Sequence, residues 1–265
     1  MNMFLHELRM YRKSTIIWTV SIVALILMFM SIYPVFSNNA EDVKKLLMGF
    51  PEAARKALSI SIDQITSYLG FYSYIFVYVT LCGSIQAMNT GISLLSKENN
   101  GKTVDFLLSK PVTRTRIITS KLLAAVTCLI ITNLVYLVSA YAISIVVVDK
   151  PIDSKLFFMI SITLIFVQII FVSLGLIISV LTQKLKSITF ASLGIVFGFF
   201  IIGMFGSVIG DTVSRYLTPF KYFNPSYIIA NASYEFSFLI TAIVIVIVSI
   251  SASYVVYSKK DIHAV

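Results

Sequence analysis

Residues 156–181 read LFFMISITLIFVQIIFVSLGLIISVL, and this stretch decides the class of fold. It contains no charged residue, and it is longer than the roughly 20 apolar residues that a helix needs to cross a lipid bilayer. An uninterrupted apolar run of this length is typical of a transmembrane helix. We therefore expect this stretch to span a membrane.

Similar runs recur along the chain, so the sequence predicts an all-α, polytopic membrane protein with six transmembrane helices. The expected spans are residues 16–33, 68–94, 122–148, 156–181, 188–209 and 236–257. The composition agrees, because 58% of the 265 residues are apolar and only 12% are charged, about half the charged share of a soluble domain. We expect residues 1–265 to form a single transmembrane domain.

Lysine and arginine are divided unequally between the two sides that this topology creates. If the N-terminus is cytoplasmic, the cytoplasmic segments carry the whole net charge of +9 and the outer segments are balanced. Positive charge favours the cytoplasmic side, so both termini are expected there. The basic residues flank the spans, which argues against nucleic-acid binding. The expected location is the plasma membrane, and the Lys- and Ile-rich composition suggests a bacterial source.

The first apolar run follows Arg9, Arg12 and Lys13, as the core of a signal peptide would. It is too long for such a core, and no cleavage site follows closely, so we expect a retained helix. Residues 1–14 carry apolar side chains at helical spacing, which favours a helix in the cytoplasmic interface. Short helices are expected in the outer segment 34–67. The aromatic-rich segment 211–235 is expected at the level of the lipid headgroups.

Residues 94–121, LLSKENNGKTVDFLLSKPVTRTRIITSK, form a polar, basic connection between the second and third spans. Gly101, Lys102 and Thr103 look like the end of a phosphate-binding loop. Such a loop requires a glycine where this chain has Ser96, and a buried strand where it has a membrane span. We therefore expect no ATP hydrolysis by this chain alone.

The same connection is well suited to a short helix. Asparagine at 99 or 100 can cap its start. Val104, Leu107 and Leu108 then fall on one face, and Pro111 ends the helix. A short helix with one apolar face fits a groove on a cytosolic partner. An amphipathic helix resting on lipid is the simpler alternative.

This connection resembles the cytosolic signature of ATP-binding-cassette (ABC) transporter permeases of the type-2 exporter family. The matching residues are Glu98, Thr103, Asp105, Phe106, Leu107, Leu108, Ser109, Pro111, Val112, Arg114 and Lys121. Residues 216–228, YLTPFKYFNPSYI, are similar to the family's outer segment before the last span, and residues 1–14 to its elbow helix. The chain departs from the pattern at Lys102, which separates a glycine and a threonine that are often adjacent in the family.

The resemblance implies a permease that forms a homodimer or heterodimer and works with two copies of a cytosolic ABC ATPase. Residues 100–109 would be the cytosolic coupling helix. ATP and magnesium would bind to the ATPase, which leaves no cofactor on this chain. The residues implied in coupling are Glu98, Thr103, Val104, Asp105, Leu107, Leu108, Pro111 and Arg114. Glu98 would brace the base of span two, and Arg114 would fix the chain where it leaves the coupling helix.

Small and polar residues in the spans have more than one interpretation. Four glycines permit close helix contact, either within a subunit or at a dimer seam, which the resemblance favours: Gly194, Gly198, Gly206 and Gly210. The aromatic outer half of span two fits an interfacial belt or a wall that contacts cargo. Residues for such a wall are Tyr72, Tyr78, Gln86 and Asn89. Polar residues expected to join helices through hydrogen bonds are Gln86, Asn89, Asn133 and Gln168.

Other functions are less consistent with the sequence. No Asp or Glu falls inside the expected spans, which weakens a proton- or sodium-coupled transporter. No His lies there to activate a serine, so we expect no enzyme. His6, His263 and the two cysteines have no metal-site spacing. The expected function is export of a hydrophobic or amphipathic peptide, antibiotic or lipid, and a membrane sensor moved by an ATPase is the alternative.

Overall fold

The computed structural model describes residues 3–58, 65–101, 113–148, 151–182, 185–210 and 212–259. Within these ranges, six helices are long and apolar enough to cross a membrane, and each overlaps one of the expected spans. They are α1 (Met3–Met30), α6 (Tyr68–Gly101), α8 (Arg114–Val147), α9 (Ser154–Leu181), α10 (Ile188–Ile209) and α13 (Phe236–Lys259). The prediction of an all-α polytopic membrane protein is confirmed.

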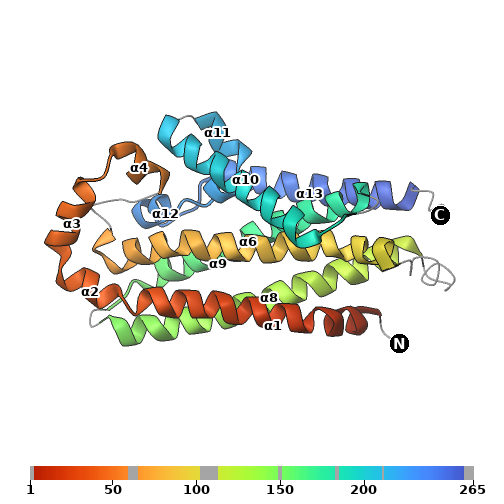
Figure 1. Ribbon diagram of the computed structural model, residues 1–265, viewed down its shortest axis with the longest axis horizontal. Coiled ribbons are helices and arrows are strands. Elements are labelled where there is room, and N and C mark those ends of the chain that lie inside the picture. The colour runs from red at the N-terminus through yellow and green to blue at the C-terminus, as the bar shows by residue number, and fades with distance from the viewer. Residues whose placement is uncertain are drawn as a thin grey trace.

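Shorter helices gather at one end of the bundle (Figure 1). Between α1 and α6 lie α2 (Tyr33–Asn38), α3 (Ala40–Met48) and α4 (Glu52–Ala57), as expected for the segment 34–67. Between α10 and α13 lie α11 (Thr212–Leu217), the 3-10 helix η1 (Pro219–Lys221) and α12 (Pro225–Asn231). We call this the distal end. The basal end is the opposite one, where α1 begins and α13 ends (Figure 1).

The helices α6 and α9 form the centre of the bundle and make its most extensive helix pair. Two glycines allow their backbones to meet. A Cβ atom on Gly91 would lie 2.5 Å from the carbonyl oxygen of Val172, and one on Gly175 would lie 2.8 Å from that of Met88. Small residues at such crossings permit close packing in the membrane, where helices gain little from the hydrophobic effect.

The other long helices surround this pair. The helix α1 packs along α8, whereas α13 packs on α9 and α10 on α6. The outward faces of these surrounding helices are apolar. Exposed examples are Ile17, Val138, Phe190 and Val244. Since lipid is the only solvent that tolerates continuous apolar surface of this kind, the chain is a multi-pass membrane protein.

The N-terminal residues differ from the expectation of a separate interfacial helix. From Met3 onward they belong to α1, which continues without a break into the first span. No proline or glycine interrupts the sequence of α1. The side chains of Glu7 and Tyr11 are buried, so this part of α1 packs against the other helices of the bundle.

The segment between α10 and α13 also differs from expectation, because its middle enters the bundle. The Thr218 hydroxyl donates a hydrogen bond of 2.9 Å to the carbonyl oxygen of Phe199. Phe199 lies about 15 Å below the Ile209 end of α10, at about 1.5 Å per residue. The Phe220 ring packs 5.2 Å from that of Phe171 on α9. A position at the headgroup level is therefore wrong for this part, and we call residues 212–235 the re-entrant segment.

Candidate functional site

Two of the residues predicted to couple the chain to an ATPase, Glu98 and Arg114, belong to helix ends at the basal end. Thr103, Val104, Asp105, Leu107, Leu108 and Pro111 are outside the described residues. Glu98 belongs to α6, although its side chain is not among those described. Arg114 is the first residue of α8, and its Nη1 donates hydrogen bonds of 3.4 Å to the carbonyl oxygens of Tyr257 and Ser258. Arg114 thus ties the start of α8 to the last turn of α13.

A buried ion pair attaches the start of α1 to α8. The Lys121 ammonium donates to the Glu7 carboxylate at 2.8 Å, and the two side chains are 5% and 7% exposed. The carboxylate thus holds Lys121, the last residue of the matching signature, inside the bundle. One turn further along α1, the Tyr11 hydroxyl lies 3.0 Å from Ser93 Oγ on α6. The first turns of α1 therefore bind the two helices that flank residues 102–112.

A polar network joins four helices within the bundle. Gln86 Nε2 donates to Thr132 Oγ1 at 2.9 Å, and that hydroxyl lies 2.9 Å from Thr19 Oγ1. Asn133 Nδ2 donates to Gln168 Oε1 at 2.5 Å. Gln168 Nε2 in turn lies 3.3 Å from Gln86 Oε1. The predicted role of Gln86, Asn133 and Gln168 in joining helices is confirmed.

Two of the residues proposed for a cargo wall are buried in the bundle. Tyr72 is fully buried, and its hydroxyl lies 2.6 Å from that of Tyr136 and 2.7 Å from Ser161 Oγ. Gln86 belongs to the polar network described above. Asn89 is half-buried in α6. Only Tyr78 of these four lines the cavity described below.

The four glycines of α10 have different surroundings. A Cβ atom on Gly194 or Gly198 would meet nothing within 4 Å, so this part of α10 is free for contact with another helix. Gly206 instead faces Ser214 of the re-entrant segment, which would clash with a Cβ atom there. Gly210 ends α10 with φ of 74°, a left-handed conformation that favours glycine. A dimer seam along the first two glycines stays a prediction.

A cavity of about 330 Å³ lies at the distal end, between α6 and α10. The helix α4 contributes Arg55 and Lys56 to its lining, and the re-entrant segment contributes residues from Phe220 to Ser226. From α6 the lining includes Ser73, Tyr74, Val77, Tyr78 and Thr80, and from α10 it includes Phe200, Gly203, Met204 and Ser207. The volume falls within the range of small-molecule sites, at its lower end.

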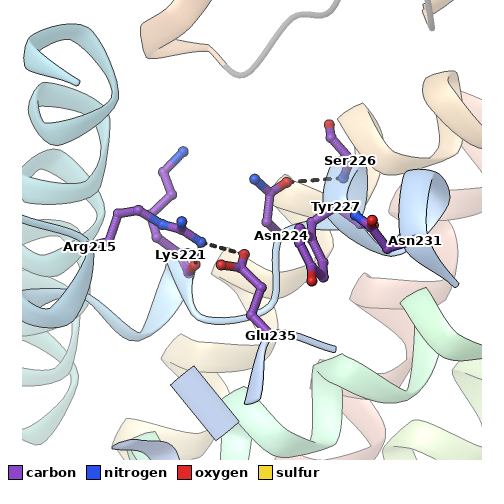
Figure 2. Close-up of polar contacts among 7 residues, drawn as sticks. All are labelled: Arg215, Lys221, Asn224, Ser226, Tyr227, Asn231 and Glu235. Carbon is purple, nitrogen blue, oxygen red and sulfur yellow. Dashed lines mark hydrogen bonds and ion pairs between the residues drawn. The ribbon is translucent and has the colours of Figure 1, made fainter. Parts of the chain in front are cut away.

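The re-entrant segment is held in place by polar contacts that Figure 2 shows in part. Arg215 Nη2 donates to the Glu235 carboxylate at 2.6 Å, and the guanidinium lies 4.2 Å from the centre of the Phe238 ring. Asn224 caps α12 by accepting a hydrogen bond of 3.0 Å from the Ser226 amide. The Tyr222 hydroxyl donates to the Tyr216 carbonyl oxygen at 2.6 Å. These contacts fix the backbone that carries Lys221 into the bundle.

Positive charge lines this cavity. Burial lowers the pKa of Lys221 below its ordinary value, and the nearby Arg215 lowers it further. Arg55 Nε is buried and has no hydrogen-bond partner. A buried donor without a partner is costly, so it offers a favourable contact to any acceptor that enters. The sequence contained one signal for this site, a lysine within an aromatic segment beside a span, but nothing that linked it to Arg55.

In the part of the chain that the structure describes, no three His, Cys, Asp or Glu side chains come together to hold a metal ion. Among curated proteins, none matches the chain. A family model for ABC-2 family transporter proteins matches residues 1–262. In this family the membrane component works with a separate ATP-binding subunit. Since the match covers almost the whole chain and the six helices agree with it, the chain belongs to the ABC-2 family of transporter proteins.

Proposed function

We propose that this chain is the membrane-spanning permease subunit of an ATP-driven exporter in the plasma membrane of a bacterium. Two permease chains, identical or different, would assemble with two copies of a cytosolic ABC ATPase. ATP and magnesium would bind to that ATPase and not to this chain. The basal end would face the cytoplasm, with both termini, and the distal end would face outward.

The observation that carries this proposal is the arrangement of the basal end. The end of α6 at Gly101 and the start of α8 at Arg114 lie where α1 begins and α13 ends (Figure 1). Residues 102–112 must connect these two helix ends, so a partner bound to them would act on both helices together. Membership of the ABC-2 family supports an ATPase as that partner.

Force applied there would reach the whole bundle. The helix α6 makes its most extensive contacts with α9. The Glu7–Lys121 pair and the Tyr11–Ser93 contact link α8 and α6 to α1. Packed helices move as rigid elements, so a small displacement at the basal end changes their separation at the distal end. That change would open or close the distal cavity between α6 and α10.

A membrane sensor that passes a mechanical signal from the ATPase is the second candidate. It would use the same basal contacts, but it would have no need of the distal cavity. The presence of a cavity lined by both charged and aromatic residues supports transport instead.

The double substitution Leu107→Asp with Leu108→Asp tests the proposal. Charges on the apolar face of the coupling segment should abolish co-purification of the ATPase and ATP-driven transport. The matched control is Leu46→Asp on α3, a leucine that is 70% exposed at the distal end. It should leave both properties unchanged. Full ATPase association and transport in the double variant would refute the coupling role.

A further inference from the structure

We propose that the distal cavity binds an amphiphile with an anionic headgroup, such as an alkyl phosphate, and that this is the cargo class. This inference rests on the proposed export function. The headgroup would lie near Lys221 and Arg55, and the apolar part would pack against the aromatic and aliphatic lining. Four features of the cavity carry the inference: its charge, its unused donor, its apolar wall and its size.

The charge of the lining is entirely positive among the described residues. Arg55, Lys56 and Lys221 line the cavity, and no carboxylate does so within those ranges. Two acids on the elements that line the cavity bind cations: Glu52 on α4 lies 2.6 Å from Lys56, and Glu235 of the re-entrant segment lies 2.6 Å from Arg215. Figure 2 shows the Lys221 ammonium extending away from Glu235. A lysine ammonium has three donor hydrogens, so it can bind an acceptor in addition to the contacts it has.

The donors near these cations suit an oxyanion. Arg55 Nε has no hydrogen-bond partner although it is buried, and a phosphate or carboxylate oxygen would provide one. The lining also includes Asn224 and Ser226, whose polar side chains lie on the re-entrant segment. A cationic ligand would face repulsion from these charges, whereas an anionic headgroup would be attracted by them.

The rest of the lining is apolar. From four elements it includes Phe76, Val77, Val167, Phe200, Met204, Phe220 and Phe223. A small hydrated anion would gain nothing from contact with this apolar surface, whereas a hydrocarbon chain would pack against it and bury apolar area. The volume of about 330 Å³ accommodates a headgroup with the start of a chain, or one small amphiphile. The combination selects an amphiphile over both free phosphate and a plain hydrocarbon.

Native mass spectrometry of the full-length chain in a neutral detergent tests this inference. Three probes are titrated: dodecyl phosphate, dodecylphosphocholine with the same chain and no net charge, and inorganic phosphate. Dodecyl phosphate should bind about tenfold more tightly than dodecylphosphocholine, the effect of one hydrogen bond to a charged group. Inorganic phosphate should compete weakly. Equal binding of the two amphiphiles would overturn a role for the charges, and equal competition by inorganic phosphate would overturn an amphiphile site.

Single substitutions test which residues bind the headgroup. Lys221→Gln and, separately, Arg55→Gln should each weaken dodecyl phosphate about tenfold, and Lys221→Arg should restore binding. Arg55 lies on the surface helix α4, so its variant folds even if Lys221→Gln does not. Lys155→Gln makes the same charge change at an exposed position of the distal end and should have no effect. Unchanged affinity in the Arg55 variant and in a folded Lys221 variant would refute the site.

The binding measurement needs neither ATP nor the ATPase. A negative result would therefore contradict the proposed cargo without contradicting the proposed export function. Loss of selectivity for dodecyl phosphate with intact ATP-driven export would contradict only the cargo class. Selective binding by the Leu107→Asp, Leu108→Asp chain, without ATPase association, would support both assignments separately.

Discussion

At the scale of single residues, the ion pair between Glu7 and Lys121 has the clearest energetic consequence. Both side chains are almost fully buried, and the charged atoms are 2.8 Å apart. Removal of one charge leaves the other buried without its counter-ion. Glu7→Gln or Lys121→Met should therefore lower the free energy of unfolding in detergent by about 3–5 kcal/mol.

Two comparisons control for this effect. Replacing both residues by methionine should cost much less than either single change, since no lone charge remains. Asp42→Asn removes an exposed pair with Lys45, separated by 3.8 Å, and should cost less than about 1 kcal/mol. A single substitution at Glu7 that cost no more than the one at Asp42 would show that the buried pair does not hold α1 to α8.

The lowered pKa of Lys221 predicts how the stability of the folded chain depends on pH. Its pKa in the folded chain is below the ordinary 10.5, because of burial and Arg215. Between that lowered pKa and 10.5 the unfolded chain binds more protons than the folded one, so stability rises with pH in this window. Below the window the folded chain bears the full cost of burying the charge.

Lys221→Met should therefore stabilise the ligand-free chain most at neutral pH, and its advantage should shrink as pH rises toward 10.5. Urea unfolding of both chains from pH 7 upward measures this difference. The charged groups around this position, Arg55, Lys56, Arg215 and Glu235, are present in both chains, so the difference between the chains reports the change at residue 221. Lining residues of α9 and α10 do not titrate. A constant difference across the range would contradict the prediction.

At the scale of helices, the crossing of α6 and α9 depends on glycine. A methyl group on Gly91 would lie 2.5 Å from the carbonyl oxygen of Val172. Relieving this clash requires a shift of the backbone of one helix, which costs more free energy than rotation of a side chain. Gly91→Ala should lower stability by about 1–3 kcal/mol, the usual cost of overpacking. Gly194→Ala is the matched control in a helix with open space around it, and it should change stability by no more than about 1 kcal/mol.

Thermal unfolding in detergent compares the two alanine variants. If Gly91→Ala were as stable as Gly194→Ala, the close approach of α6 and α9 would not exist in solution. The sequence does not single out Gly91 from the glycines of α10, because a backbone crossing depends on how two helices dock and not on either helix alone.

The helices themselves followed from the sequence for a simple reason. A run such as residues 156–181 must form a helix that satisfies its own backbone hydrogen bonds in lipid, whatever its neighbours are. The Glu7–Lys121 pair and the path of the re-entrant segment could not be foreseen in the same way. Glu7 and Lys121 are far apart in the chain, and Phe220 is an aromatic residue that suits either the headgroup level or the interior. Both the ion pair and the path of the re-entrant segment depend on how the helices pack together.

At the scale of the whole molecule, the bundle has two different ends. The basal end holds the end of α6 and the start of α8, and the distal end holds a positively lined cavity. The central pair α6–α9 runs between them. This arrangement suits a permease whose energy comes from another polypeptide, as membership of the ABC-2 family also indicates. The prediction at this scale concerns where residues 102–112 lie and what they contact.

The most direct test places a single cysteine at Leu107, in a chain whose Cys82 and Cys128 are replaced by alanine. Photocrosslinking from this cysteine in native membranes should capture one separate polypeptide that contains the ATPase. In intact cells, the same cysteine should resist a thiol reagent that cannot cross the membrane. Labelling from outside the cell, or the absence of any crosslink to an ATPase, would contradict the account.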